Sequence, residues 1–236
     1  MFKAILFDLD GTLLNIDMDY FLKQYFRKMV NLASEMGYQE GNRLVEQVWR
    51  STGVMIADKN PNITNEEAFM QDFYRNWPYL PKEFNNFFER YYQECFPLLK
   101  EFCQPFPEVP EMMEYVMNQG IKVVIATNAV FPLSALQNRI EWAGIGRHQF
   151  DLITSYEVMH FCKPHIEYYQ EIAEKIGVKP EECLMVGNDT GEDLPAGQLG
   201  MKTFLVEDML IDRGAKYKAD WHGKIPKLAD FIKSCI

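Results

Sequence analysis

Short apolar segments that alternate with helical patterns constrain the fold of this chain more than any other feature. Five such segments occur, at residues 3–8, 122–127, 151–155, 183–186 and 203–206. Apolar runs of this length are typical of buried strands. Helical spacing covers three stretches between them, each followed by a glycine suited to a left-handed helix cap: residues 110–119, 133–143 and 166–176. This alternation predicts an α/β fold with a doubly wound parallel sheet.

The alternation is interrupted after the first strand by a long stretch with helical spacing only. Apolar residues keep that spacing over residues 22–36 and again over residues 84–95. Between these series, Thr64 is followed three residues later by Glu67, the capping-box pattern that opens a helix. These patterns predict an all-helical domain inserted into the sheet domain. The predicted division is a core of residues 1–14 and 103–236 and a helical insertion of residues 15–102.

Net charge and cysteine content indicate which class of partner and which cellular compartment to expect. A formal net charge of -10 repels the phosphate backbone of nucleic acids, so a small-molecule partner is favoured. The five cysteines are odd in number and contain no CxxC pair, which favours a reducing compartment. No segment approaches the roughly 18 apolar residues of a membrane span, and the N-terminal segment is unlike a signal peptide. We therefore expect a cytoplasmic protein with no membrane partner; the sequence does not indicate its oligomeric state.

Polar side chains follow four of the predicted strands. The carboxyl ends of parallel strands meet at one edge of a sheet, where ligands bind. Several acids gathered at that edge would repel one another unless a cation compensated, and hard oxygen ligands of this kind suit Mg²⁺. In strand order, the residues are Asp8, Asp10, Gly11 and Thr12; Thr127 and Asn128; Lys163; and Asn188, Asp189 and Asp193.

The chemistry open to these residues is transfer of a phosphoryl group. Asp8 could attack phosphorus as a carboxylate and form a covalent intermediate. Asp10 could protonate the leaving oxygen and afterwards activate water, since one carboxyl group can alternate between acid and base. Thr127 and Asn128 would bind the phosphoryl oxygens, and Lys163 would supply a positive charge to them.

Four segments, in this order, resemble the motifs of the haloacid dehalogenase superfamily. The helical insertion between the first two resembles that superfamily's C1-type cap, so the resemblance covers the whole chain. It implies a Rossmann-like core, with Asp8 as nucleophile and Asp10 as acid and base. The segments are Asp8-Leu9-Asp10-Gly11-Thr12-Leu13, Thr127-Asn128, Lys163-Pro164 and Gly187-Asn188-Asp189-Thr190-Gly191-Glu192-Asp193.

The resemblance also implies a magnesium site, with one departure from the usual pattern. Its ligands would be the Asp8 carboxylate, the Asp10 main-chain carbonyl and an acid of the fourth motif. Many members place an aspartate directly after the glycine of that motif, where this chain has Asn188. We therefore expect Asp189 to contact the metal first, with Asp193 as the second choice.

The expected function is magnesium-dependent hydrolysis of a small phosphorylated metabolite through an aspartyl-phosphate. A phosphosugar mutase of the same superfamily would use the same core chemistry, and only the insertion would decide between them. A receiver-like phospho-aspartate signalling domain has a similar set of residues, but in such domains no helical insertion follows the first strand. Within the insertion, the basic residues Lys23, Arg27 and Lys59 are expected to influence the choice of substrate.

Overall fold

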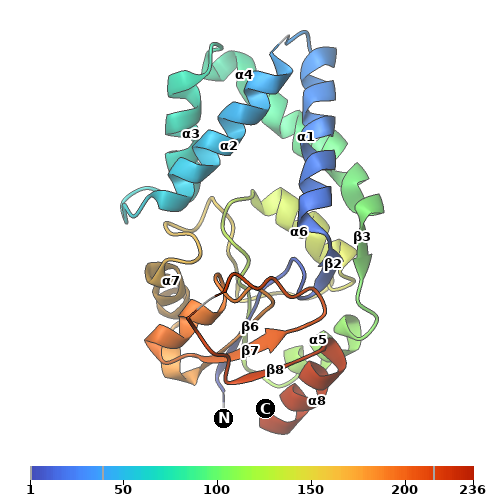
Figure 1. Cartoon of the computed structure of the whole chain (residues 1–236), viewed down its shortest axis with the longest axis vertical. Coiled ribbons are helices and arrows are strands. Elements are labelled where there is room, and N and C mark those ends of the chain that lie inside the picture. Colours follow the sequence, from blue (N-terminus) through green and yellow to red (C-terminus); the bar gives the residue numbers. More distant parts are fainter. Residues whose placement is uncertain (1, 39, 215) are drawn as a thin grey trace.

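The computed structural model describes residues 2–38, 40–214 and 216–236. A six-stranded sheet lies at the centre of the sheet domain, with all strands parallel and in the order β5-β4-β1-β6-β7-β8 (Figure 1). Numbered along the chain within this sheet, that order is 3-2-1-4-5-6, the arrangement of Rossmann folds. The predicted doubly wound α/β sheet is confirmed. Its strands are β1 (Ala4–Phe7), β4 (Lys122–Ile125), β5 (Leu152–Ile153), β6 (Cys183–Gly187), β7 (Lys202–Val206) and β8 (Trp221–Gly223).

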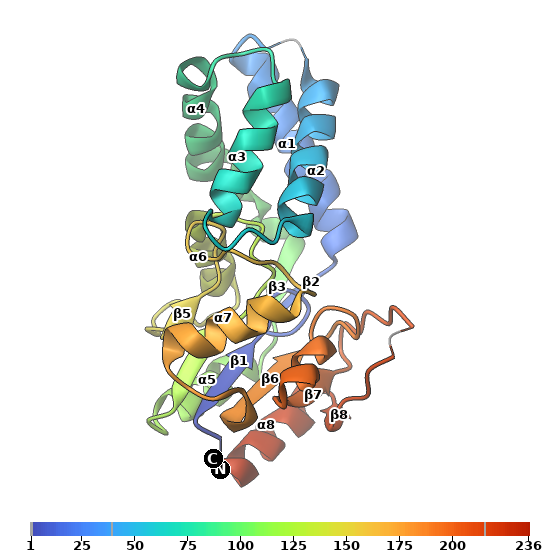
Figure 2. The same ribbon diagram turned by 90° about the vertical axis from the view of Figure 1, so that its left-hand side faces the viewer.

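Helices cover both faces of this sheet (Figure 2). Ile5 and Phe7 belong to one apolar cluster, which includes buried residues of α5 (Val109–Met117) and α8 (Ile225–Cys235). Ala4 and Leu6 belong to a second cluster, which includes buried residues of α7 (Ile166–Ile176). Successive side chains of a strand point to opposite faces, so β1 is buried throughout. The remaining helical segments of the sheet domain are α6 (Leu133–Trp142), η3 (Pro180–Glu182) and η4 (Leu194–Leu199).

The insertion consists of helices that stand above the carboxyl edge of the sheet (Figures 1 and 2). Thr64 and Glu67 form the predicted capping box at the start of the third of these helices. None of the helices that the structure describes is long and apolar enough to cross a membrane. The helical segments are α1 (Met18–Glu35), α2 (Gly41–Ala57), α3 (Asn65–Asn76), α4 (Pro81–Arg90), the π-helical η1 (Tyr91–Cys95) and the 3-10 helical η2 (Phe96–Phe102).

Two short strands join the insertion to the sheet domain. β2 (Leu14–Ile16) pairs with β3 (Cys103–Pro105) as an antiparallel ribbon, with Leu14 opposite Pro105. The expectation of helices only from residue 15 was therefore wrong for Asn15 and Ile16. Leu14 and Ile16 are both buried and Asn15 between them is half-buried, the alternation of a strand. Three residues are too few for this alternation to stand out in a sequence.

Candidate active site

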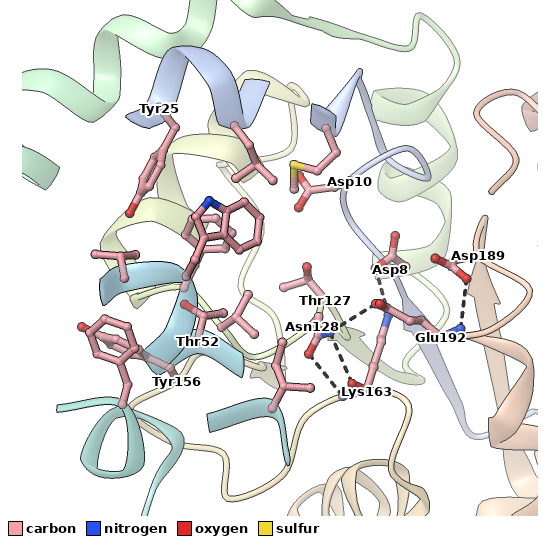
Figure 3. A pocket seen from close by; sticks show the side chains of 18 of the residues that line it. Asp8, Asp10, Tyr25, Thr52, Thr127, Asn128, Tyr156, Lys163, Asp189 and Glu192 are labelled. Atoms are coloured by element: carbon pink, nitrogen blue, oxygen red, sulfur yellow. Dashed lines mark hydrogen bonds and ion pairs between the residues drawn. The ribbon is translucent and has the colours of Figure 1, made fainter. Parts of the chain in front are cut away.

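One cavity of about 260 Å³ lies at the carboxyl edge of the sheet, and residues of both the sheet domain and the insertion line it (Figure 3). β1, β4 and β6 each deliver polar residues to it within two positions of the strand end. This edge includes the switch point at β1, where the strand order reverses and α/β folds bind their ligands. All seven predicted site residues line the cavity: Asp8, Asp10, Thr127, Asn128, Lys163, Asp189 and Asp193.

Lys163 connects two of the acids at the floor of this cavity. Its Nζ atom lies 2.9 Å from Asp8 Oδ1 and 2.6 Å from Asp193 Oδ1, and the residue is only 1% exposed. Burial disfavours the ammonium, but the carboxylates of Asp193 and Asp8 outweigh it and hold the pKa of Lys163 well above its usual range. The lysine is therefore a permanent positive charge beside the Asp8 carboxylate.

Thr12 contacts the other oxygen of Asp8, a role that the sequence did not reveal. The Thr12 hydroxyl lies 3.0 Å from Asp8 Oδ2 and 3.1 Å from Asn188 Oδ1, so its single proton can be donated to either. The Asn188 amide donates to the Met209 carbonyl at 2.6 Å. Gly11 has a φ of +80°, and a Cβ atom there would lie 2.2 Å from Asn188 Nδ2. Only glycine allows the turn after β1 to approach Asn188 this closely.

Asp10 pairs with a buried arginine that was not among the predicted site residues. The Arg139 guanidinium, on α6, forms an ion pair with the Asp10 carboxylate and lies 4.3 Å from the centre of the Phe131 ring. Burial raises the pKa of Asp10 to about 6, although the charge of Arg139 opposes this shift. A pKa in this range is one at which a carboxyl group can act as either an acid or a base near neutral pH. An arginine at a helical position gives no sequence signal for such a contact.

The two acids of the fourth motif have different partners. Asp193 Oδ2 accepts a hydrogen bond from the Asp189 main-chain N–H at 2.9 Å, and burial raises the pKa of Asp193 to about 7. The Asp189 carboxylate instead pairs with Arg213, whose Nε lies 2.9 and 2.7 Å from its two oxygens. Asp189 Oδ1 also accepts hydrogen bonds from the main-chain N–H groups of Gly191 and Glu192. Asp193 therefore faces Lys163, whereas Asp189 holds Arg213.

The loop after β4 is held by hydrogen bonds within the protein. The Thr127 carbonyl accepts from the hydroxyls of Thr154 and Tyr168, both at 2.7 Å. Asn128 Oδ1 accepts from the Lys163 main-chain N–H at 3.2 Å, and its Nδ2 donates to Glu192 Oε2, also at 3.2 Å. These contacts give the loop a defined position beside Lys163. In this position Thr127 and Asn128 line the cavity.

The charges around the cavity leave an excess that a divalent cation would offset. The side chains here include five carboxylates and three cations, so the formal charges differ by two negative charges. The carboxylates are those of Asp8, Asp10, Asp189, Glu192 and Asp193, and the cations are Lys163, Arg139 and Arg213. Within residues 2–38, 40–214 and 216–236, no three His, Cys, Asp or Glu side chains are grouped as a ready-made metal cluster. Mg²⁺ usually takes one or two carboxylates and fills its remaining positions with other oxygens, so this acidic edge fits it.

The wall of the cavity opposite Asp8 is apolar and aromatic. Leu22 and Phe26 of α1, Val48 and Trp49 of α2, Phe69 of α3 and Phe88 of α4 contribute to it. Phe84 and Phe87 are fully buried in the insertion, as their helical spacing predicts. Phe88, which has the same spacing, faces the cavity instead.

The basic residues expected to influence substrate choice do not line this cavity. Lys23 and Arg27 are exposed on α1, on a different face from Leu22 and Phe26. Lys59 forms an exposed ion pair with Glu167, 2.9 Å away. These three residues therefore make no direct contribution to the cavity. Helical spacing does not show which side of a helix faces the sheet domain, and their influence on substrate choice stays a prediction.

Comparisons with known proteins identify the family of this chain. The family model for haloacid dehalogenase-like hydrolases matches residues 2–200. The glyceraldehyde 3-phosphate phosphatase of Methanothermobacter thermautotrophicus is 26% identical over 219 residues, which cover 90% of this chain and 88% of that protein. The phosphoglycolate phosphatase of Aquifex aeolicus is 27% identical over 207 residues, which cover 86% and 84%.

A solved structure supports the fold independently. The HAD phosphatase from Thermococcus onnurineus superposes with a TM-score of 0.59 at 20% identity, covering 98% of this chain and 97% of that one. At this identity the likeness concerns the fold alone. The family model, by contrast, spans most of the sequence, including all four motifs. The chain therefore belongs to the haloacid dehalogenase-like hydrolase family.

Proposed function

We propose that this protein is a magnesium-dependent phosphatase that hydrolyses a small phosphorylated metabolite through an aspartyl-phosphate on Asp8. The observation that carries the proposal is the position of Asp8, whose carboxylate lies at the cavity floor with Lys163 on one oxygen and Thr12 on the other. The names of the two relatives, both phosphatases, support the same class of reaction. In this proposal the helical insertion, residues 15–102, is a cap over the site.

In the first step, an Asp8 oxygen attacks phosphorus and the bond from phosphorus to the leaving oxygen breaks. Lys163 and Thr127 stabilise the charge on the transferred group. Asp10, which burial keeps partly protonated near neutral pH, gives its proton to the leaving oxygen. Arg139 holds the Asp10 carboxyl group in place through their ion pair. The products are the free alcohol and phosphorylated Asp8.

In the second step, water hydrolyses the aspartyl-phosphate. Asp10, now a carboxylate, accepts a proton from this water as the water oxygen attacks phosphorus. The bond between phosphorus and Asp8 breaks, and inorganic phosphate leaves. Asp10 has regained its proton and Asp8 its negative charge, so the site is ready for another molecule of substrate.

The residues that would hold Mg²⁺ are Asp8, through its carboxylate, Asp10, through its main-chain carbonyl, and Asp189, with Asp193 as the second choice. When bound, the ion would offset the repulsion between the Asp8 carboxylate and the anionic phosphate. For Asp189 to serve as a ligand, its carboxylate must release Arg213, which contacts both of its oxygens. Asp193 would have to share its carboxylate with Lys163.

The alternatives receive less support from the cavity. Asp8 follows the first strand and a helical insertion follows Asp8, unlike the order of a receiver-like signalling domain. A phosphosugar mutase must bind the many hydroxyl groups of a sugar, and the apolar wall opposite Asp8 offers them few partners. We therefore propose hydrolysis as the reaction.

Asp8→Asn tests this proposal. We expect the variant to lose at least about a thousandfold in kcat toward phosphomonoesters, because the amide is a poor nucleophile, while its circular dichroism stays unchanged. The control is Asp230→Asn, an exposed acid on α8. After an acid quench, mass spectrometry should find a phosphorylated peptide containing Asp8 in the wild type only. Activity near the wild-type level in Asp8→Asn would remove Asp8 as the nucleophile.

A further inference from the structure

The cavity wall opposite Asp8 determines which leaving group fits, and we propose that the substrate is a phosphomonoester with an uncharged, apolar leaving group about the size of one aromatic ring. This inference rests on the proposed phosphatase function and specifies its substrate class. It differs from what the relatives' names suggest, since phosphoglycolate carries a carboxylate and glyceraldehyde 3-phosphate a short polar chain.

The first observation is the shape of the charge distribution in the cavity. Figure 3 shows Asp8, Lys163 and Glu192 on one side and Tyr25, Thr52 and Tyr156 on the other. Among the described residues that line the cavity, every charged side chain belongs to the sheet domain, and those of the insertion are uncharged. The phosphoryl group would therefore lie beside the charged side chains of the sheet domain, and the leaving group would lie against the uncharged side chains of the insertion.

The second observation is that the cations of the cavity are already paired. Lys163 and Arg213 are the two cationic side chains among the described lining residues. Lys163 contacts the carboxylates of Asp8 and Asp193, and Arg213 those of Asp189 and Glu192. If Asp189 releases Arg213 to hold Mg²⁺, Glu192 remains the partner of that arginine. A second anionic group on the substrate would therefore lie near carboxylates, with no unpaired cationic side chain among the described lining residues. Such an unpaired charge is costly to bury.

The polar atoms of the wall are few and neutral. The hydroxyls of Tyr25 and Tyr92 lie 2.9 Å apart and share one hydrogen bond. Burial raises the pKa of Tyr92 to about 12, and burial likewise places the pKa of Tyr25 well above its usual range, so neither becomes an anion near neutral pH. The hydroxyl groups of Thr52 and Tyr156 could form hydrogen bonds with one or two polar atoms of the leaving group, but not with the many hydroxyls of a sugar.

The size of the cavity indicates how large a leaving group it can enclose. The volume is about 260 Å³. A protein cavity of roughly 150 Å³ is enough to bind benzene, so the volume here accommodates a phosphoryl group together with about one ring. Trp49, which is 51% exposed, lies 5.3 Å from Phe26 between ring centres, and both rings line the cavity. An aromatic or aliphatic ring can therefore pack on this wall.

A matched set of substrates tests the inference. Benzyl phosphate and 4-carboxybenzyl phosphate share a ring and a leaving oxygen, and they differ by one carboxylate far from phosphorus. We expect kcat/KM to be about 100-fold or more higher for benzyl phosphate than for 4-carboxybenzyl phosphate, and also higher than for phosphoglycolate and pyrophosphate. The three other compounds each carry a second anionic group. A higher kcat/KM for any of these three, in hydrolysis that depends on Asp8, would overturn the substrate class and leave the phosphatase function intact.

A variant that adds a cation to the wall sharpens this test. Thr52 and Val54 lie on the same helix, but only Thr52 lines the cavity. Thr52→Lys should shift the ratio of the two kcat/KM values about tenfold or more toward 4-carboxybenzyl phosphate, and Val54→Lys should leave it unchanged. Equal shifts in both variants would contradict the assignment of the wall.

Binding measurements distinguish a failure of the inference from a failure of the proposed function. Benzylphosphonate and 4-carboxybenzylphosphonate cannot be hydrolysed, so calorimetry reports their affinities whether or not the protein turns over a phosphomonoester. We expect the uncharged ring to bind more tightly. That result without hydrolysis of any ester would refute the phosphatase function alone, whereas equal or reversed affinities would refute the inference about the wall.

Discussion

Lys163→Met removes the buried cation between Asp8 and Asp193. The methionine side chain is similar in length, so it fills most of the space, but the two carboxylates at 2.9 and 2.6 Å from Nζ lose their shared partner. Loss of one partner from a buried ion pair costs about 3–5 kcal/mol, because the other charge stays buried and unpaired. We expect a decrease of this size in the free energy of unfolding at pH 8.

The control is Lys59→Met, which breaks an ion pair with Glu167 at a similar distance, 2.9 Å. Both partners of that pair are partly exposed, so its loss should cost less than about 1 kcal/mol. The double variant Lys163→Met with Asp193→Asn should recover about 1–3 kcal/mol of the loss, because it removes one of the two uncompensated charges. Urea unfolding followed by circular dichroism measures all three variants.

The pH dependence gives an independent check on this reasoning. The folded pKa of Asp193, about 7, lies above its unfolded value of 3.8, so its ionisation lowers stability as the pH rises between these values. The charge of Lys163 lowers that folded pKa, and its removal raises the pKa further. The deficit of Lys163→Met should therefore be small at pH 4 and largest at pH 8. A deficit below about 1 kcal/mol at pH 8, or one that grows toward low pH, would refute the pairing.

Two further predictions concern the acids beside Asp8. Asp10 must carry a proton in the first step and has a pKa of about 6, so kcat/KM should fall as the pH rises through that value. Arg139→Met removes a positive charge that lowers this pKa, so it should move the fall in kcat/KM to higher pH. An unmoved pH profile would show that another group causes the fall. Asp189→Asn should weaken Mg²⁺ binding to chelator-treated protein about tenfold or more, and Arg213→Ala should tighten it by freeing the Asp189 carboxylate. Calorimetric titration measures both, and a larger loss in Asp193→Asn would assign the metal to Asp193 instead.

The sequence was sufficient to predict five of the six strands of the described sheet and the residues that gather at its edge. Buried parallel strands are continuous apolar runs, and their order along the chain makes the polar residues after them recognisable. Since parallel strands end at the same edge, Asp8, Thr127, Lys163 and Asp193 could be placed together without coordinates. The strand β8 was missed, because its three residues include two exposed polar or amphipathic side chains and resemble a loop.

The partners of these residues depended on contacts between distant segments. Arg139 follows Asp10 by 129 positions and Arg213 follows Asp189 by 24, and both arginines lie on elements whose sequence patterns describe only their own helix or loop. Thr12 was part of a recognised motif, but its hydroxyl contact with Asn188 depends on how closely β1 and β6 end beside each other. Charge pairs of this kind arise from packing and leave no periodic signal.

The face that the insertion turns toward the site was decided by tertiary structure alone. Helical spacing correctly identified Phe84 and Phe87 as buried, because burial within a helical bundle follows from the pattern of each helix. It could not distinguish the exposed Lys23 and Arg27 from Trp49, which lines the cavity, since all three lie outside that internal core. Which of them meets the substrate depends on how the insertion is seated on the sheet domain, and that orientation is set by packing between residues far apart in the sequence.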